Sequence, residues 1–213
     1  MHWLDPSYLP VTTGTVHQFV LNPHGDADGM IFTCGTEVHF PPHRAAEICA
    51  AIHPGQTVKV HGVKPGAANL IAAVSVESPA GEQIVDNGPP GDEDEAGKKA
   101  HKAELKPVPM DAEGVVKQAL HGPKGETHGA LLEDGIIIRF PPDEAEGLSS
   151  LLKAGAHIAV KGDGLNTKIG TVIDAREIGG SKDRLRRLQG KKPNHDKKRS
   201  DDRNADLHRA IGC

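Results

Sequence analysis

The chain carries the same module twice, at a shift of one hundred residues. When each residue from 14 to 62 is compared with the residue one hundred positions later, 14 of 49 positions are identical and no gap is needed. The identities include Phe-Pro-Pro at 40–42 and 140–142 and a set of glycines in the same register. Chance alignment does not concentrate identities in this way. The sequence therefore predicts two small domains of one fold, not one large domain.

The first segment of each copy has the pattern of a β-strand. Val16, Gln18 and Val20 alternate with His17 and Phe19. Alternation with a period of two is typical of a strand with one buried face. We therefore expect the valines and Gln18 on the core face, with His17 and Phe19 on the outer face.

A helix is expected in the middle of each copy. Residues 43–53 carry apolar side chains at helical spacing, and Gly55 follows where a helix would stop. Pro41 and Pro42 precede it and end the strand before it, because proline cannot donate to a ladder. Cys34-Gly35 matches Asp134-Gly135, a pair favoured in tight hairpin turns. Further strands are expected at 30–32, 36–40, 58–60 and 69–76.

The order of three strands, a helix and two strands resembles the OB-fold, a five-stranded Greek-key barrel with a helix between its third and fourth strands. The resemblance covers both copies, and the Phe-Pro-Pro segment is similar to that of uncharacterised bacterial OB-like proteins. It implies an all-β chain with one helix per module, built as two tandem five-stranded OB-like barrels. A small SH3-like barrel is the alternative, but that fold does not need a helix of this length.

Composition divides the chain into four parts. We expect a first barrel with an N-terminal extension at 1–78, an acidic Gly/Pro linker at 79–112, a second barrel at 113–180 and a basic, mobile tail at 181–213. The net charge is −3 for each barrel, −4 for the linker and +6 for the tail. The chain is thus an acidic body with a basic end.

Histidines of the first copy face cations of the second at five positions. The pairs are His17/Lys117, His24/Lys124, His39/Arg139, His53/Lys153 and His61/Lys161. OB-folds commonly bind oligonucleotides on strands two and three and on neighbouring loops. Outward-facing cations there would suit phosphate, and the histidines would gain charge as the pH falls. The other interpretation is an ordinary polar surface inherited through duplication.

The basic tail is a second candidate for anion binding, because clustered Lys and Arg attract nucleic acid non-specifically. It could equally be a solubilising terminus or lie against the acidic linker. The candidate anion-binding residues are His17, His39, His61, Lys117, Lys124, Arg139 and Lys161 on the barrels, and Arg184, Arg186, Arg187, Lys191 and Lys192 in the tail.

Other classes of site are not indicated. Cys34, Cys49 and Cys213 lack the paired spacing of a zinc site or a disulfide framework, and the 13 histidines show no helical ligand pair. Asp26 and Asp28 are interpreted as turn residues. We expect no metal, no cofactor and no catalytic residue. No segment has the pattern of a signal peptide or a membrane span, so the expected setting is the cytoplasm.

The sequence therefore favours a non-catalytic protein that binds single-stranded DNA or RNA weakly, with help from the tail. Aromatic residues make up only 3% of the chain, so base stacking has little support. The alternative is a protein-interaction or adaptor module without nucleic-acid binding.

Overall fold

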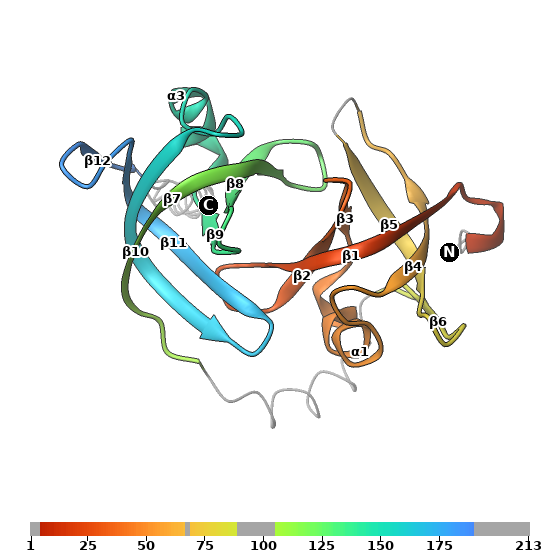
Figure 1. Cartoon of the computed structure of the whole chain (residues 1–213). Coiled ribbons are helices and arrows are strands. Elements are labelled where there is room, and N and C mark those ends of the chain that lie inside the picture. Colours follow the sequence, from red (N-terminus) through yellow and green to blue (C-terminus); the bar gives the residue numbers. More distant parts are fainter. Residues whose placement is uncertain (1–4, 67–68, 89–104, 190–213) are drawn as a thin grey trace, which may run out of the picture.

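The computed structural model describes residues 5–66, 69–88 and 105–189, and it contains two five-stranded barrels side by side (Figure 1). The strands of the first half are β1 (Val11–Leu21), β2 (Ala27–Phe32), β3 (Glu37–His39), β4 (Thr57–Val63), β5 (Leu70–Glu77) and β6 (Gln83–Val85). The strands of the second half are β7 (Val108–His121), β8 (Thr127–Leu132), β9 (Ile137–Arg139), β10 (His157–Thr167), β11 (Gly170–Gly179) and β12 (Leu185–Arg187).

Each barrel closes with the strand order of an OB-fold. In the first, β1 pairs with both β2 and β4, β2 pairs with β3, and β4 pairs with β5, all antiparallel. The parallel pair β3–β5 closes the ring, and β9–β11 does the same in the second barrel. The predicted all-β class with two tandem five-stranded OB-like barrels is confirmed.

One short helical segment lies between the third and fourth strands of each barrel, as predicted. The helical elements are η1 (Pro6–Tyr8), η2 (Pro42–Arg44) and α1 (Ala45–Ala51) in the first half, and η3 (Pro142–Glu144) and α3 (Ala145–Leu148) in the second. Helix α3 is shorter than α1, and Gly147 within it is a poor helix former. Phe40 and Phe140 both lie in the barrel cores.

The alternation expected for the first strand is wrong beyond Val16. A β-bulge at His17 shifts the register, so Val16 pairs with Phe32 whereas Gln18 pairs with Ile31. Neighbouring residues on β2 point to opposite faces, so the bulge reverses the side on which the rest of β1 points. Phe19 is therefore a buried core residue, contrary to the prediction, and Gln18 and Val20 point outward.

Regular structure extends past the predicted barrel boundaries. Strand β6 lies within the segment expected to be a linker, and β7 begins at Val108, before residue 113. Strand β12 lies within the segment expected to be a mobile tail, where it pairs with β11. Each barrel thus has a sixth strand that pairs with its fifth strand: β6 pairs with β5, and β12 pairs with β11. Neither β6 nor β12 takes part in closing the ring.

Candidate functional site

The two barrels pack together through the outer faces of their first three strands. On the first barrel this face carries Val20, Ile31 and Glu37, and the cross-strand register places all three opposite the core side. All three are nevertheless buried. Their burial comes from the second barrel, which covers them.

The centre of this inter-barrel interface is apolar. Leu120, Leu131 and Ile137 of the second barrel belong to the same hydrophobic cluster as the core of the first barrel. These three residues are fully buried. Burial of a leucine or isoleucine side chain contributes about 1.5–3 kcal/mol. The interface is therefore a hydrophobic contact of the kind that holds domains in a fixed arrangement.

Around this centre the interface is nearly symmetric. The side-chain amide of Gln18 donates to the carbonyl oxygen of Gly135 at 3.2 Å, and that of Gln118 donates to Gly35 at 3.3 Å. His17 contacts Lys117, the residue that matches it in the repeat: Lys117 Nζ lies 2.7 Å from His17 Nε2. Burial and the neighbouring ammonium lower the pKa of His17, so its Nε2 accepts this hydrogen bond.

One part of the interface is not symmetric: it contains a buried polar network around Arg139, for which His39 provides no equivalent. The guanidinium of Arg139 reaches across the interface, where Nη2 donates to both carboxylate oxygens of Asp28 and Nε donates to the carbonyl oxygen of Leu21. Its Nη1 lies 2.5 Å from His128 Nε2, while His128 Nδ1 lies 3.2 Å from the carbonyl oxygen of Leu120. Burial, with the Arg139 charge beside it, lowers the pKa of His128 to about 4. A neutral imidazole that accepts at Nε2 and donates at Nδ1 fits all these contacts.

Glu37 of the first barrel lies next to this network and binds the second barrel. Its carboxylate accepts from the His121 backbone N–H at 2.9 Å and from His121 Nδ1 at 2.7 Å. The hydrogen bond to Glu37 raises the pKa of His121. His39, which matches Arg139 in the repeat, lies within 4.0 Å of Glu37 and packs near the His128 ring.

Four of the residues predicted to bind anions on the barrels lie in this interface. His39 and Arg139 point outward from their own barrels, as expected, but both are buried between the barrels. His17 and Lys117 also lie in the interface and contact each other. The interface thus occupies the β2–β3 face on which OB-folds commonly bind oligonucleotides.

The remaining barrel candidates are separate from that interface. His61 Nδ1 donates to the carbonyl oxygen of Pro6, which holds the N-terminal turn on β4. Lys161 is exposed on β10, and Lys124 is exposed in the loop between β7 and β8. The structure therefore does not bring the seven barrel candidates into one site.

Three tail candidates lie together at strand β12. Arg184, Arg186 and Arg187 are all exposed. Arg186 forms an ion pair with Glu144 at 3.1 Å, whereas Arg184 and Arg187 make no ion pair with a described residue. Lys191 and Lys192 lie outside the described residues.

Sequence reasoning missed four residues of the interface network: Asp28, Glu37, His121 and His128. Asp28 lies on β2 and binds Arg139, whereas its sequence context predicts a turn residue. Two apolar residues in the sequence could have identified the interface. Leu131 and Ile137 occupy outward positions, where a barrel surrounded by water would carry polar side chains.

The described part of the chain holds no group of three or more His, Cys, Asp or Glu side chains placed to bind a metal ion. None of its helices is long and apolar enough to cross a membrane. Cys34 is exposed in the turn between β2 and β3, where its hydrogen bond with Thr36 lowers the thiol pKa.

Comparison with known proteins gives no family. No protein-family model and no curated protein sequence matches the chain. Among solved structures it is similar to the single-stranded DNA binding protein from Thermus aquaticus. A deletion mutant is 17% identical, with 87% of this chain and 96% of that chain covered and a TM-score of 0.24. The wild-type protein is 16% identical, with 85% and 93% covered and a TM-score of 0.25. The order of the strands in each barrel is what makes the fold OB-like.

Proposed function

We propose that this is a non-enzymatic cytoplasmic protein that binds single-stranded nucleic acid weakly, through the basic end at β12 and the chain that follows it. The observation that carries the proposal is the exposed arginine group at β12, made of Arg184, Arg186 and Arg187. The sequence continues from there with Lys191 and Lys192. Clustered cations at the end of a strand suit the phosphates of a flexible polyanion.

The usual OB-fold ligand face is not part of this proposal. Arg139 and His39 are buried between the barrels, and Lys117 contacts His17 there. Using that face would require the apolar centre of the interface to be exposed. We therefore assign the binding to cations that are already on the surface.

The binding should be electrostatic and sensitive to salt. Tyr8 is the one described aromatic side chain that is largely exposed, and it lies on the first barrel. Stacking contributes about 1–3 kcal/mol per base where aromatic side chains are available. Without it, affinity depends on phosphate contacts and on the counterions that they release.

The test is fluorescence anisotropy with labelled single-stranded DNA and RNA at two salt concentrations. The variant R184E/R187E should bind at least about tenfold more weakly than the native chain at low salt. The matched control, K59E/K64E, makes the same change in net charge on the first barrel and should bind within about threefold. The variant K191E/K192E measures the contribution of the following segment.

Two results would overturn the proposal. One is the absence of binding by the native chain at low salt. The other is an equal loss in the β12 variant and in the first-barrel control, because that would mean that only total charge matters.

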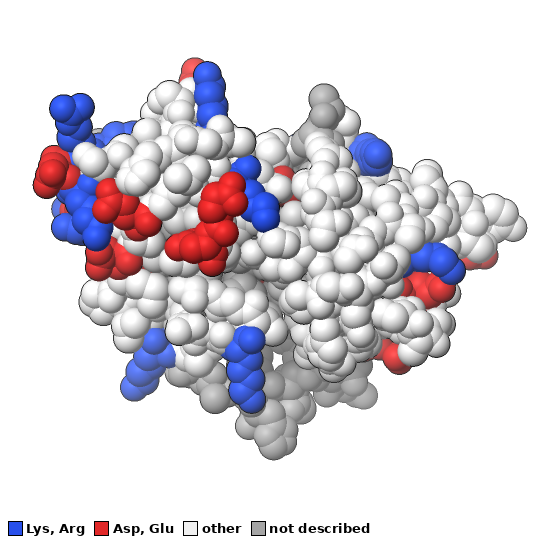
Figure 2. Space-filling view, in the orientation of Figure 1, with Lys and Arg blue, Asp and Glu red and all other residues white. Residues whose placement is uncertain are grey.

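A different observation favours the alternative, a protein-interaction module. Charged side chains gather over the second barrel, whereas the visible face of the first barrel is mostly uncharged (Figure 2). Tyr8, Val11 and Val63 of the first barrel are exposed. An exposed apolar patch with few charges is typical of a surface that contacts protein. If the native chain binds no nucleic acid, the adaptor function is the one to pursue.

A further inference from the structure

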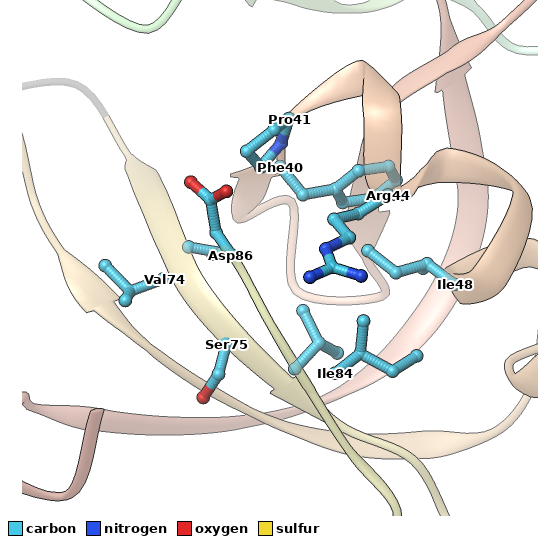
Figure 3. Close-up of a pocket in the computed structure, with 10 residues that line it drawn as sticks. Phe40, Pro41, Arg44, Ile48, Val74, Ser75, Ile84 and Asp86 are labelled. Carbon is cyan, nitrogen blue, oxygen red and sulfur yellow. The ribbon is translucent and has the colours of Figure 1, made fainter. Parts of the chain in front are cut away.

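The hollow beside Arg44 in the first barrel is too small to admit a ligand. Phe40, Ile48 and Ile84 are among the residues that line it, and it has room for about one water molecule. Figure 3 shows the Arg44 guanidinium close to Ile48 and Ile84, with Asp86 across from it. The titratable groups that can respond to the surroundings lie instead between the two barrels, where four histidines line the interface.

The charges of this interface are balanced only while its histidines are neutral. Two cations, Lys117 and Arg139, lie there with two anions, Asp28 and Glu37. The histidines among them are His17, His39, His121 and His128. If all four were protonated, the two cations and four imidazoliums would together face the same two anions. Like charges repel more strongly in a buried contact than in water, because burial limits screening.

His128 of β8 is the histidine that is least able to accept a proton in the packed protein. Arg139 Nη1 lies 2.5 Å from its Nε2. From the first barrel it is faced by the His39 ring, with 6.3 Å between the ring centroids, and by Asp28, whose carboxylate oxygens accept from Arg139. Glu126, in the loop before β8, also acts on it but is exposed. A proton on His128 would therefore place an imidazolium against a guanidinium, with Asp28 already engaged.

His17 and His121 respond to protonation in opposite directions. A proton on His17 would remove the acceptor of its hydrogen bond with Lys117 and leave two cations in contact. The acid that acts on His17 is the exposed Glu133. A proton on His121 instead strengthens its hydrogen bond with Glu37. Protonation of His121 thus favours the packed barrels, whereas protonation of His17 or His128 opposes them.

We propose that the inter-barrel interface is an acid-sensitive contact, in which protonation of His128 and His17 separates the two barrels while each barrel stays folded. Separation would uncover the outer faces of β1–β3 and β7–β9 and would give both imidazoles access to water. This inference does not depend on the nucleic-acid function proposed above.

The size of the effect follows mainly from His128. Its pKa is about 4 in the packed protein and about 6.5 once water surrounds it. Between these values only the separated form binds the proton, so acid favours separation. From pH 7 to pH 5, this histidine alone should multiply the ratio of separated to packed molecules by about twenty. His17 adds to this factor and His121 reduces it, so we expect a net rise of at least about fivefold.

The test is thiol labelling of the full chain with an aromatic disulfide reagent that reacts at both pH values. Val20→Cys places a thiol on the outer face of β1, where the second barrel covers it, whereas Val60→Cys places one in the core of the first barrel. Each rate is divided by that of a small free thiol at the same pH, and peptide mass spectrometry resolves the sites. From pH 7 to pH 5 the normalised rate should rise at least about fivefold at position 20 and less than about twofold at position 60.

Three further variants, each combined with V20C, identify the responsible histidine. H128Q should abolish the rise at position 20, and H121Q should enlarge it because the opposing proton is removed. H53Q, the matched change at an exposed histidine outside the interface, should leave the rise unchanged.

Four results would overturn the proposal. They are the absence of a rise at position 20, equal rises at positions 20 and 60, a rise that H128Q retains, and a rise in H121Q that is no larger than in V20C alone. Equal rises at the two positions would mean that acid unfolds the first barrel and does not separate it from the second. The H121Q result decides the matter even if H128Q does not fold.

Discussion

Arg139 of the second barrel binds both carboxylate oxygens of Asp28 in the first barrel, at 2.8 and 2.9 Å, and the arginine side chain is 4% exposed. The pair joins residues that are far apart in the chain, so it forms only when the two barrels are packed together. It also removes Arg139 from the surface on which the repeat pattern placed it. The inter-barrel interface therefore determines which of the cations are available to a ligand.

Arg139→Met should destabilise the protein strongly. The change leaves the Asp28 carboxylate and the carbonyl oxygen of Leu21 without their donors in a buried setting. Removing one partner of a buried pair costs about 3–5 kcal/mol, and partial exposure of Asp28 places this case near the lower end. Urea denaturation measures the loss.

The control for this prediction is Arg187→Met, which removes an exposed arginine and should change the free energy of unfolding by about 0.5 kcal/mol or less. The double variant D28N/R139M should be more stable than R139M alone, because no unpaired charge remains. Equal stability of R139M and R187M would show that the pair does not form.

His128→Gln should make stability less dependent on pH. The pKa of His128 is about 4 in the folded protein and about 6.5 in an unfolded chain. Between these values only the unfolded chain binds the proton, so the free energy of unfolding decreases as the pH falls from about 6.5 to about 4. Between about pH 7 and pH 5, the free energy of unfolding should fall by about 1–2 kcal/mol more in the native protein than in the variant.

His121 acts in the opposite direction, and it is present in both proteins compared. Its raised pKa contributes stability below about pH 6.5, and that contribution is lost as the pH rises through the folded value. Comparing the two proteins at each pH removes it from the difference. Urea denaturation curves that show the same pH dependence for both proteins would mean that His128 is not buried against Arg139.

Gly14→Ala and Gly114→Ala should differ, although the two glycines are equivalent in the repeat. A methyl group at position 14 would overlap the ring of Phe32, whereas at position 114 the nearest atom is Leu132 Cδ1 at 3.3 Å. Overpacking of a core costs about 1–3 kcal/mol. The free energy of unfolding should therefore fall by that much in G14A and by less than about 1 kcal/mol in G114A. Thermal unfolding of the two variants decides the matter, and a larger loss in G114A would contradict the packing described for β1.

Cys34 should react with iodoacetamide much faster than Cys49. Cys34 is exposed and its hydrogen bond with Thr36 lowers the thiol pKa, whereas burial raises the pKa of Cys49 to about 11. Since the thiolate is the nucleophile, a difference of at least about tenfold is expected near neutral pH. Peptide mass spectrometry follows each site, and Thr36→Val should slow the reaction at Cys34 alone. Equal rates at the two cysteines would rule out this ranking.

Much of each barrel could be predicted from local patterns. Gly35 and Gly55 adopt positive φ at the turns where the sequence required them, and the Phe-Pro-Pro segment leads into the helix in both copies. The bulge at His17 could not be predicted, because nothing in the alternation of Val16 and Gln18 marks an extra residue. One unrecognised bulge was enough to place Phe19 on the wrong side of the strand.

The candidate site was less predictable than the fold, because it depends on contacts between copies. His39 and Arg139 do point away from their own cores, as alternation predicted. Period-two patterns describe one barrel at a time, so they cannot show that the outer face of one barrel is covered by the other. Leu131 and Ile137, which are apolar at outward positions, were the local sign of that contact.

The packing of the two barrels through their β1–β3 and β7–β9 faces is tested most directly by nuclear Overhauser effects across the interface. We predict contacts between the Gln18 side-chain amide protons and the α-protons of Gly135, and between Gln118 and Gly35, in the full chain. Both should be present together, because the two hydrogen bonds are related by the repeat. Absence of both contacts, with the barrels tumbling independently, would contradict the interface and would mean that the β2–β3 faces are open to a ligand.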